Sequence, residues 1–517
     1  MSGDQRRGCS GHRNPSRVRT MLRGNGYPVL NGNAVQPFRH RVRNHTQFEP
    51  CMNQPIDESN ATDRTWPRLV ECWTQAVKHA AENAHRLQRA SHPNADPNTH
   101  RRQWFDLWGQ ATESYLRSSD FLKLLKRHID TLIAAKLAGE FDPADARVKG
   151  KTLSDDVRAL SMSFGQLFPE TRALPDRIHT GDACAATPDA PGNASKWATS
   201  FEVVYEETPL KLLHFKPRHV RFAEPVLICF ALVNRPYILD LKANRSVVRR
   251  LLDRGFDVYV IDWGSPDESD SALRLEDYVC SMLNNAVDFV CQRSHTPRLS
   301  LLGYCMGGTM STLYAALHPE RIGNLILMAA PIRFDGEDGL LNLWARPEIF
   351  DVDGLIDAFG NCPGEFLQFV FQLMKPVQNF AEKQLSFMEN ANDAEFLDDF
   401  ATIERWSSDT IPIAGETFRD FVSMLYQEDR LVNNQMVLAG ETIRLAAITC
   451  PILLLVAQRD HLVPPKSTLA IKERVSSRDV TSLSIEAGHI GLAVGSQAQR
   501  NLWPLAAQWI ASHSTKR

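Results

Sequence analysis

The stretch that decides the fold is residues 298–308, RLSLLGYCMGG. Its first seven residues form a short apolar run of the length of a buried strand, and a helix-like sequence follows. Glycines stand two residues before and two residues after Cys305, at Gly303 and Gly307. This is the spacing of a nucleophile elbow, a tight strand-to-helix turn that exposes one nucleophile, here with cysteine in place of serine. The pattern therefore predicts a cysteine nucleophile at the carboxyl end of a central strand.

The start of a helix suits a reactive cysteine for a physical reason. The free N–H groups and the positive end of the helix dipole favour the thiolate of Cys305. The backbone amide of Met306, the first residue of that helix, is the predicted first oxyanion donor. The alternative is a buried cysteine in a glycine-rich turn, and the motif by itself does not exclude it because short patterns recur by chance.

Two later segments supply an acid and a base. Asp460 ends the apolar run ILLLVAQRD, and His489 lies in EAGHIGL, directly after the last predicted strand. The chain order Cys305, Asp460, His489 is the one that elbow enzymes require. Taken singly, an acid at a strand end is often a helix N-cap, and a Gly-His pair is often a turn. Their joint occurrence in the required order favours a catalytic triad, whereas the competing His461 is expected to point elsewhere because it adjoins Asp460.

The second oxyanion donor is expected in the loop after the apolar strand VLICFALV, residues 226–233. The amide of Val233 is the predicted donor, and that of Asn234 is the alternative. Asp262 ends another predicted strand, in VIDWGSPD, and is expected to hold its own loop rather than to act in catalysis.

The region after residue 200 alternates between strands and helices. It opens with a hairpin over 201–217, and the first helix is predicted from about 239 to Arg254. This alternation predicts a mostly parallel sheet with helices on both faces, an α/β-hydrolase fold. The predicted parts are a disordered basic tail (1–60), a helical N-terminal region (61–200), a first part of the core (201–334), a helical cap insertion (335–445) and a second part of the core (446–517).

Composition excludes several classes of protein. The chain has 517 residues, of which 43% are hydrophobic and 23% charged, and a net charge of -3, so it has enough apolar surface for a large core and no overall preference for polyanions. Its ten cysteines form no C-x-x-C pair, which favours reduced thiols over a disulfide framework. The longest apolar runs are too short to span a bilayer, and a cytoplasmic location is expected.

The first 60 residues are rich in Arg, Asn, Gly, Pro and Ser and have no usable periodicity. Such a segment buries too little apolar surface to offset its ordering entropy, so a disordered tail is predicted. The alternatives are an arginine-rich leader that contacts nucleic acid or an anionic surface, a transit peptide, and translation that begins at Met52.

Several independent segments resemble the catalytic domain of polyhydroxyalkanoate synthases. They are GYCMGGT (303–309), ALVNRPYILDL (231–241), RGFDVYVIDWGSPD (254–267), DTIPIAGETFRDF (409–421), RDHLVPP (459–465) and AGHIGL (487–492). The resemblance extends over roughly residues 200–517. It implies that Cys305 is the acylated nucleophile, His489 its base and Asp460 the third member, which also helps His489 to activate the incoming hydroxyl.

The resemblance implies further properties. The substrates are (R)-3-hydroxyacyl-CoA thioesters and the growing polyester, and no cofactor or metal is expected because CoA is part of the substrate and of the leaving group. A homodimer at the surface of polyester granules is expected, without nucleic acid or a membrane span. The Tyr-Cys-Met elbow and the short tail after His489 resemble the classes that need a second synthase subunit. The helical stretch 64–139 is interpreted as a built-in substitute for that subunit or as an elaborated docking platform.

Two rival interpretations remain. A cysteine-dependent hydrolase of the thioesterase or dienelactone-hydrolase type uses the same three residues with water as acceptor, but the apolar cap over 335–445 argues against water in the site. A non-catalytic granule scaffold needs no intact nucleophile, acid and base.

Overall fold

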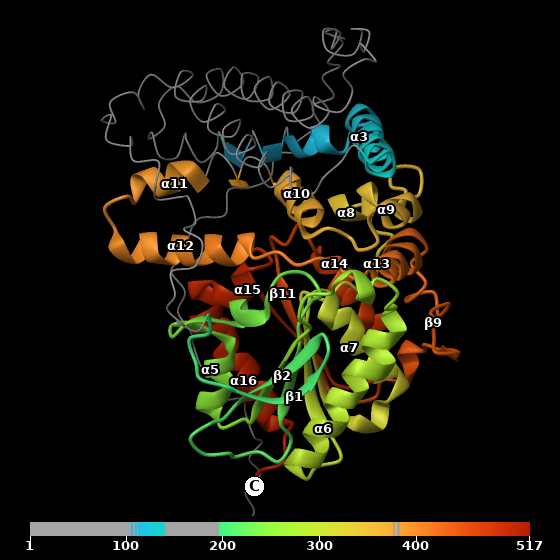
Figure 1. The fold of residues 1–517 in the computed structure, drawn as a ribbon. Coiled ribbons are helices and arrows are strands. Elements are labelled where there is room, and N and C mark those ends of the chain that lie inside the picture. The colour runs from blue at the N-terminus through green and yellow to red at the C-terminus, as the bar shows by residue number, and fades with distance from the viewer. Residues whose placement is uncertain (1–104, 107–108, 111, 140–195, 376–377, 380–382) are drawn as a thin grey trace, which may run out of the picture. The chain divides into compact units, whose positions relative to one another are not determined.

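A computed structural model describes residues 105–106, 109–110, 112–139, 196–375, 378–379 and 383–517 (Figure 1). The predicted tail (1–60), a possible start at Met52, the predicted helical residues up to 104 and the connector 140–195 lie outside the described residues, and the predictions made for them stay predictions.

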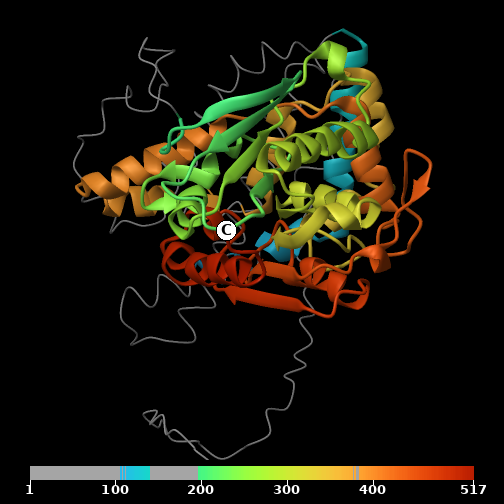
Figure 2. The same ribbon diagram turned by 90° about the horizontal axis from the view of Figure 1, so that it is seen from below.

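The centre of the structure is an eight-stranded sheet with the order β1-β2-β6-β3-β7-β8-β11-β12. The first hairpin joins the sheet antiparallel, and all the strands from β6 to β12 run parallel. Figure 2 shows the hairpin at one edge and the C-terminal strands at the other. The strands are β1 (Glu202–Glu207), β2 (Leu210–Phe215), β3 (Val226–Cys229), β6 (Val258–Asp262), β7 (Leu299–Tyr304), β8 (Ile322–Met328), β11 (Ile452–Ala457) and β12 (Val480–Ile485).

Helices cover both faces of the sheet. In Figure 1, α5 and α16 lie on one face, and α6 and α7 lie on the other. Every side chain of β3, β7 and β11 is buried, as expected for parallel strands covered on both sides. The core helices are α5 (Val247–Arg254), α6 (Asn284–Ser294), α7 (Met306–Leu317), α14 (Pro465–Leu469), α15 (Gly491–Val494) and α16 (Trp503–Ser512), with a π-helical turn over Asp277–Leu283 before α6.

Two sequence predictions are wrong in their boundaries. The helix expected from about residue 239 begins only at Val247, because a short hairpin of β4 (Asp240–Lys242) and β5 (Arg245–Ser246) takes up the residues before it. The buried Asp240 carboxylate accepts hydrogen bonds from the Thr199 amide (2.6 Å) and the Ser246 hydroxyl (2.5 Å). Ser246 then caps α5 by accepting from the Arg249 amide at 2.8 Å.

The strand expected over 226–233 is also shorter than predicted. Only Val226–Cys229 pairs with both neighbours, and the chain then leaves the sheet. The Phe230 carbonyl accepts from the Trp263 indole at 2.8 Å instead of joining a ladder. Residues 230–235 are consequently a loop at the carboxyl edge of the sheet.

Helices between β8 and β11 form the cap over this edge (Figure 1). They are α8 (Leu340–Trp344), α9 (Val352–Phe359), α10 (Gly364–Met374), α11 (Lys383–Glu389), α12 (Ala394–Ser408) and α13 (Gly415–Asp420), followed by a π-helical turn over Phe421–Gln427 and the hairpin of β9 (Val437–Leu438) and β10 (Glu441–Thr442).

The N-terminal helix α3 (Ser119–Leu137) packs against α9. The helical sequence pattern breaks at Ser118, whose hydroxyl caps α3 by accepting from the Phe121 amide at 3.2 Å. Beyond its end, Gly139 has a φ of 74°, as expected of the predicted stop. Of the helices in the described part of the chain, none is long and apolar enough to cross a bilayer.

Candidate active site

The elbow places Cys305 between β7 and α7 in a rare backbone conformation. Its φ is 56° and its ψ is -127°, which a non-glycine residue seldom adopts. The amide of Cys305 donates to the Met328 carbonyl at 3.0 Å, and the Cys305 carbonyl accepts from the Gly308 amide at 2.8 Å. The turn is therefore held from the neighbouring strand and from the first turn of the helix.

The flanking glycines are required by close backbone contacts. A Cβ on Gly307 would lie 2.2 Å from the Cys229 carbonyl oxygen, and one on Gly303 would lie 2.4 Å from the Gly308 Cα. Neither position has room for a side chain. The absence of side chains lets the start of α7 approach the end of β3.

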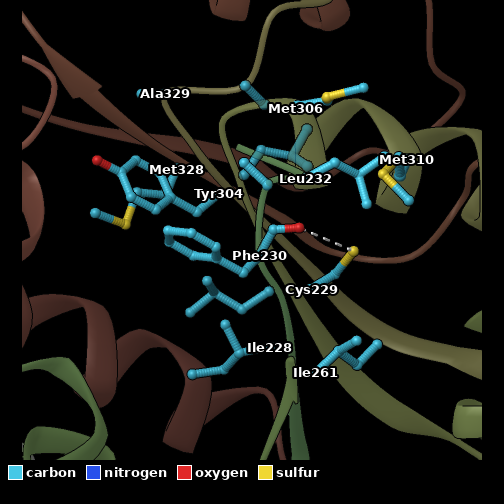
Figure 3. Close-up of a cluster of buried hydrophobic side chains, with 14 of the residues drawn as sticks. Ile228, Cys229, Phe230, Leu232, Ile261, Tyr304, Met306, Met310, Met328 and Ala329 are labelled. Carbon is cyan, nitrogen blue, oxygen red and sulfur yellow. Dashed lines mark hydrogen bonds between the residues drawn. The ribbon is translucent and has the colours of Figure 1, made fainter. Parts of the chain in front are cut away.

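Apolar side chains surround the turn. Figure 3 shows Phe230 and Leu232, from the loop after β3, gathered with Met306 and Met310 of α7. These side chains are between 0% and 6% exposed. Burial of this kind keeps water away from the strand ends beneath the nucleophile.

Asp460 is held firmly after β11. It is 6% exposed, and its Oδ1 accepts from the backbone amides of Leu462 (3.0 Å) and Val463 (2.9 Å). Its Oδ2 lies 2.7 Å from Nδ1 of His489. Since both oxygens accept hydrogen bonds, the carboxylate has one orientation, which directs the histidine.

His489 connects the acid to the nucleophile. Burial by itself would lower the pKa of His489, but the negative charges of Asp460 and Cys305 and hydrogen bonds to both outweigh it and raise the pKa to about 10. Nδ1 faces Asp460, so the other ring nitrogen is the one left for the sulfur. The arrangement favours an imidazolium between the carboxylate and the sulfur at neutral pH.

Two tyrosines that the sequence reasoning missed belong to this site. The Tyr304 hydroxyl donates to the His489 carbonyl at 3.1 Å, and its ring stacks on the imidazole with 5.1 Å between centroids. Tyr426 comes from the cap, and the charge of Cys305 adds to burial in raising its pKa. Tyr304 adjoins the nucleophile in sequence and was visible in the motif, whereas nothing in the sequence connects Tyr426 to residue 305.

The other predicted residues lie at the same edge. Met306 is the first residue of α7, and Val233 is a partly buried residue of the loop after β3, followed by Asn234 with a φ of 61°. Asp262 accepts from the Gly264 amide at 3.0 Å, which is the expected loop-holding contact. His461 has its pKa lowered by burial and by Lys375, and it is not the partner of Asp460.

Comparisons with known proteins agree with this architecture. A family model for the alpha/beta hydrolase fold matches residues 224–495, and one for the N-terminus of poly-beta-hydroxybutyrate polymerase matches residues 195–251. Subunit PhaC of the poly(3-hydroxyalkanoate) polymerase of Haloferax mediterranei is 43% identical over 350 residues, 68% of this chain and 69% of the relative. The chain belongs to the poly(3-hydroxyalkanoate) polymerase subunit PhaC family.

Other relatives and solved structures are similar. The PhaC subunit of Allochromatium vinosum is 39% identical and is matched over 60% of this chain and 87% of the relative. A soluble variant of monoglyceride lipase from Saccharomyces cerevisiae is 14% identical, with a TM-score of 0.41 over 64% of this chain and 100% of that one. The predicted α/β-hydrolase fold and the predicted family are confirmed.

Proposed function

We propose that this chain polymerises (R)-3-hydroxyacyl-CoA thioesters into polyester through a covalent thioester on Cys305. The observation that carries the proposal is the His489 imidazole, bonded on one side to Asp460 at 2.7 Å and paired on the other with the sulfur at the helix start. Members of the family are named poly(3-hydroxyalkanoate) polymerases, and they are acyltransferases.

In the acylation step, the Cys305 thiolate attacks the carbonyl carbon of the acyl-CoA thioester. The amides of Met306 and Val233 donate to the resulting oxyanion. The C–S bond to CoA then breaks, and the CoA sulfur takes the proton of the His489 imidazolium. One thioester replaces another, so the acyl group stays activated without a cofactor or a metal.

In the elongation step, His489 removes the proton from the hydroxyl of an acyl unit. The oxygen attacks a second acyl thioester, an ester bond forms, and the departing sulfur takes the proton. Asp460 stabilises the imidazolium in both steps. Water in place of this hydroxyl would release free acid. The buried apolar residues at the elbow therefore support the hydroxyl as the acceptor, because they keep water out.

The proposal is tested with the purified chain and 3-hydroxybutyryl-CoA. CoA release and insoluble polyester are both expected, and Cys305→Ala should lower CoA release by on the order of 10³-fold or more. Cys280→Ser is the matched control, since this partly buried cysteine lies in the π-helical turn before α6. Free 3-hydroxybutyrate without polymer would indicate the hydrolase instead, and unchanged granule formation in cells that carry Cys305→Ala would indicate the scaffold.

We also propose that the N-terminal region acts as a built-in partner subunit. The Trp344 indole of α8 donates to the Leu116 carbonyl at 3.1 Å, so residues before α3 contact the cap directly. Deletion of residues 1–195 should abolish polymerase activity, with no rescue by an added subunit. Full activity of the truncated chain would contradict this role.

We further propose that the chain acts as a homodimer at the surface of polyester granules.

A further inference from the structure

Cap helix α12 is fastened to the core beside the segment that carries His489. The Asp399 carboxylate, 13% exposed, pairs with Lys242 at 2.6 Å and with Arg245. Arg245 also donates from Nη1 to the Val494 carbonyl at 2.9 Å. Val494 is the last residue of α15, the helix that begins two residues after His489. A single guanidinium therefore joins α12 to the helix that follows the histidine.

The C-terminal end of α12 is hydrogen-bonded to the loop after β3, residues 230–235, which carries the predicted oxyanion amide and is called the oxyanion loop. The indole of Trp406, 4% exposed, donates to the Arg235 carbonyl at 2.8 Å. Arg235 directly follows the strained Asn234, and its own Nη1 donates to the Gly264 carbonyl at 3.1 Å. The backbone that carries the predicted oxyanion amide is thus held on one side by the cap.

A third contact lies immediately beyond α12. Asp409 accepts from the Tyr237 hydroxyl at 3.0 Å and from Lys196 at 2.6 Å. Tyr237 is 5% exposed and belongs to the 3₁₀ turn that follows the oxyanion loop. Figure 1 shows α12 extended above α15, and the middle and the C-terminal end of α12 contact different segments of the core.

These contacts have one physical property in common. Each buries a charged or polar group that has a strong partner only when α12 lies against the core. Departure of the helix would leave the Asp399 carboxylate, the Trp406 indole and the Arg235 carbonyl without these partners. Docking of α12 is consequently coupled to the order of both loops.

We infer that Asp399 and Trp406 are positioning residues. Asp399 acts through Arg245 on α15, the helix that follows His489 and is called the histidine helix, and Trp406 acts on the oxyanion loop through the Arg235 carbonyl. The inference rests on the proposed function for its kinetic consequence. Neither residue touches the nucleophile in this scheme. They act by setting the distance between the sulfur, the imidazole and the oxyanion amides, to which acyl transfer is highly sensitive.

Asp399→Asn in the full chain is the first test, because it removes the charge and keeps the shape. We expect kcat for CoA release to fall roughly tenfold with KM nearly unchanged, as for a group that orients the reacting atoms. Asp398→Asn is the matched control, since Asp398 is the neighbouring acid, is 74% exposed and, among the described residues, has its ion pair with Lys242 and not with Arg245. Equal kcat values for the Asp399→Asn and Asp398→Asn chains would overturn the inference.

Arg245→Met separates positioning from simple attachment of the cap. Lys242 still pairs with Asp399 in this variant, but the Val494 carbonyl loses its donor. We expect kcat to fall as far as in Asp399→Asn. The original kcat in Arg245→Met would show that Arg245 does not position the histidine.

Hydrogen exchange gives a readout that does not depend on activity. The amides of residues 492–495 donate to the carbonyls of His489, Ile490 and Gly491, and Asp399→Asn should speed their exchange while Asp398→Asn should not. Trp406→Phe, which keeps an aromatic ring and removes the donor, should speed exchange of the Asp240 amide, which donates to the Tyr237 carbonyl in the turn after Arg235. Unchanged exchange in both segments would overturn the inference. A chain that releases no CoA but shows these changes would instead contradict the proposed function alone.

Discussion

At the scale of single residues, the proposed mechanism depends on the charge state of His489. Its pKa is raised to about 10, mainly because the carboxylate of Asp460 outweighs the cost of burial. The pKa of His489 in the folded chain lies above the unfolded value of 6.5, so proton binding by His489 stabilises the fold. This stabilisation is complete below pH 6.5 and is lost as the pH rises through about 10. The imidazolium that acylation requires therefore persists across the neutral range.

The first prediction concerns Asp460→Asn. Removal of the negative charge lowers the pKa of His489, so the alkaline limb of the pH profile of kcat/KM should move to lower pH, and kcat should fall. CoA release measured from pH 5 to 10.5 checks this. Asp262→Asn is the control, since the side chain of this strand-end acid accepts from the nearby Gly264 amide and not from His489. An alkaline limb that stays in place in the Asp460→Asn chain would contradict the assignment of the acid.

The second prediction concerns Tyr304→Phe. The change removes the hydrogen bond to the His489 carbonyl and keeps the stacked ring, so we expect a loss of about 1 kcal/mol, or about fivefold in kcat. The pH profile should keep its shape because no charge is lost. Replacement by leucine removes the stacked ring as well and should slow the enzyme further. Equal rates for all three chains would show that Tyr304 does not orient the histidine.

At the scale of elements, the elbow depends on how closely α7 approaches β3. Cys305 is held at positive φ from the Met328 carbonyl, and Gly307 lies against the carbonyls that end β3. A turn this tight is stable only because the strands and helix around it are already packed. The nucleophile is thus positioned by packing of the core as well as by its own motif.

The third prediction is that Gly307→Ala destabilises the fold and inactivates the enzyme. The new Cβ would lie 2.2 Å from the Cys229 oxygen and 2.4 Å from the Phe230 oxygen, both backbone atoms that cannot move independently. The free energy of unfolding should fall by about 1–3 kcal/mol or more, measured by urea denaturation. Gly336→Ala is the control, because its nearest atom would be 4.0 Å away. An equally stable Gly307→Ala chain would contradict this account of the elbow.

At the scale of the whole molecule, the N-terminal segment is connected to the loop that enters the cap. Arg117 donates to the carbonyls of Glu337 (2.7 Å) and Asp338 (2.8 Å). The Asp338 carboxylate pairs in turn with Lys466, six residues after Asp460, at 2.8 Å. The segment before α3 thus contacts the same loop as the residues that follow Asp460.

The fourth prediction is that Arg117→Met loosens this attachment. Hydrogen exchange of the α3 amides should rise, because two charged hydrogen bonds worth about 1–3 kcal/mol in total are lost from a partly exposed site. Arg127→Met, a change at an exposed residue of α3, is the control. If both variants exchange like the original chain, Arg117 does not hold the segment.

Some parts of the fold and of the site could be predicted from the sequence, and others could not. The elbow, the acid and the histidine were predictable because each depends on residue type and spacing close to a strand end. The start of α5 could not be predicted, because the hairpin before it depends on Asp240, which accepts from the distant Thr199 amide. The end of β3 could not be predicted, because it depends on how α7 and Trp263 contact the carbonyls of Cys229 and Phe230.

By itself, the sequence determined the order of strands and helices, the family and the three residues of the predicted triad, since local spacing and hydrophobic pattern are properties of the chain. Only the tertiary structure decided that Tyr426 of the cap feels the charge of Cys305 and that α12 pairs with Arg245 and donates to the Arg235 carbonyl. Asp399 and Arg245 are paired across 154 positions of sequence. No periodicity connects such distant residues, because their contact exists only after the sheet and the cap have packed together.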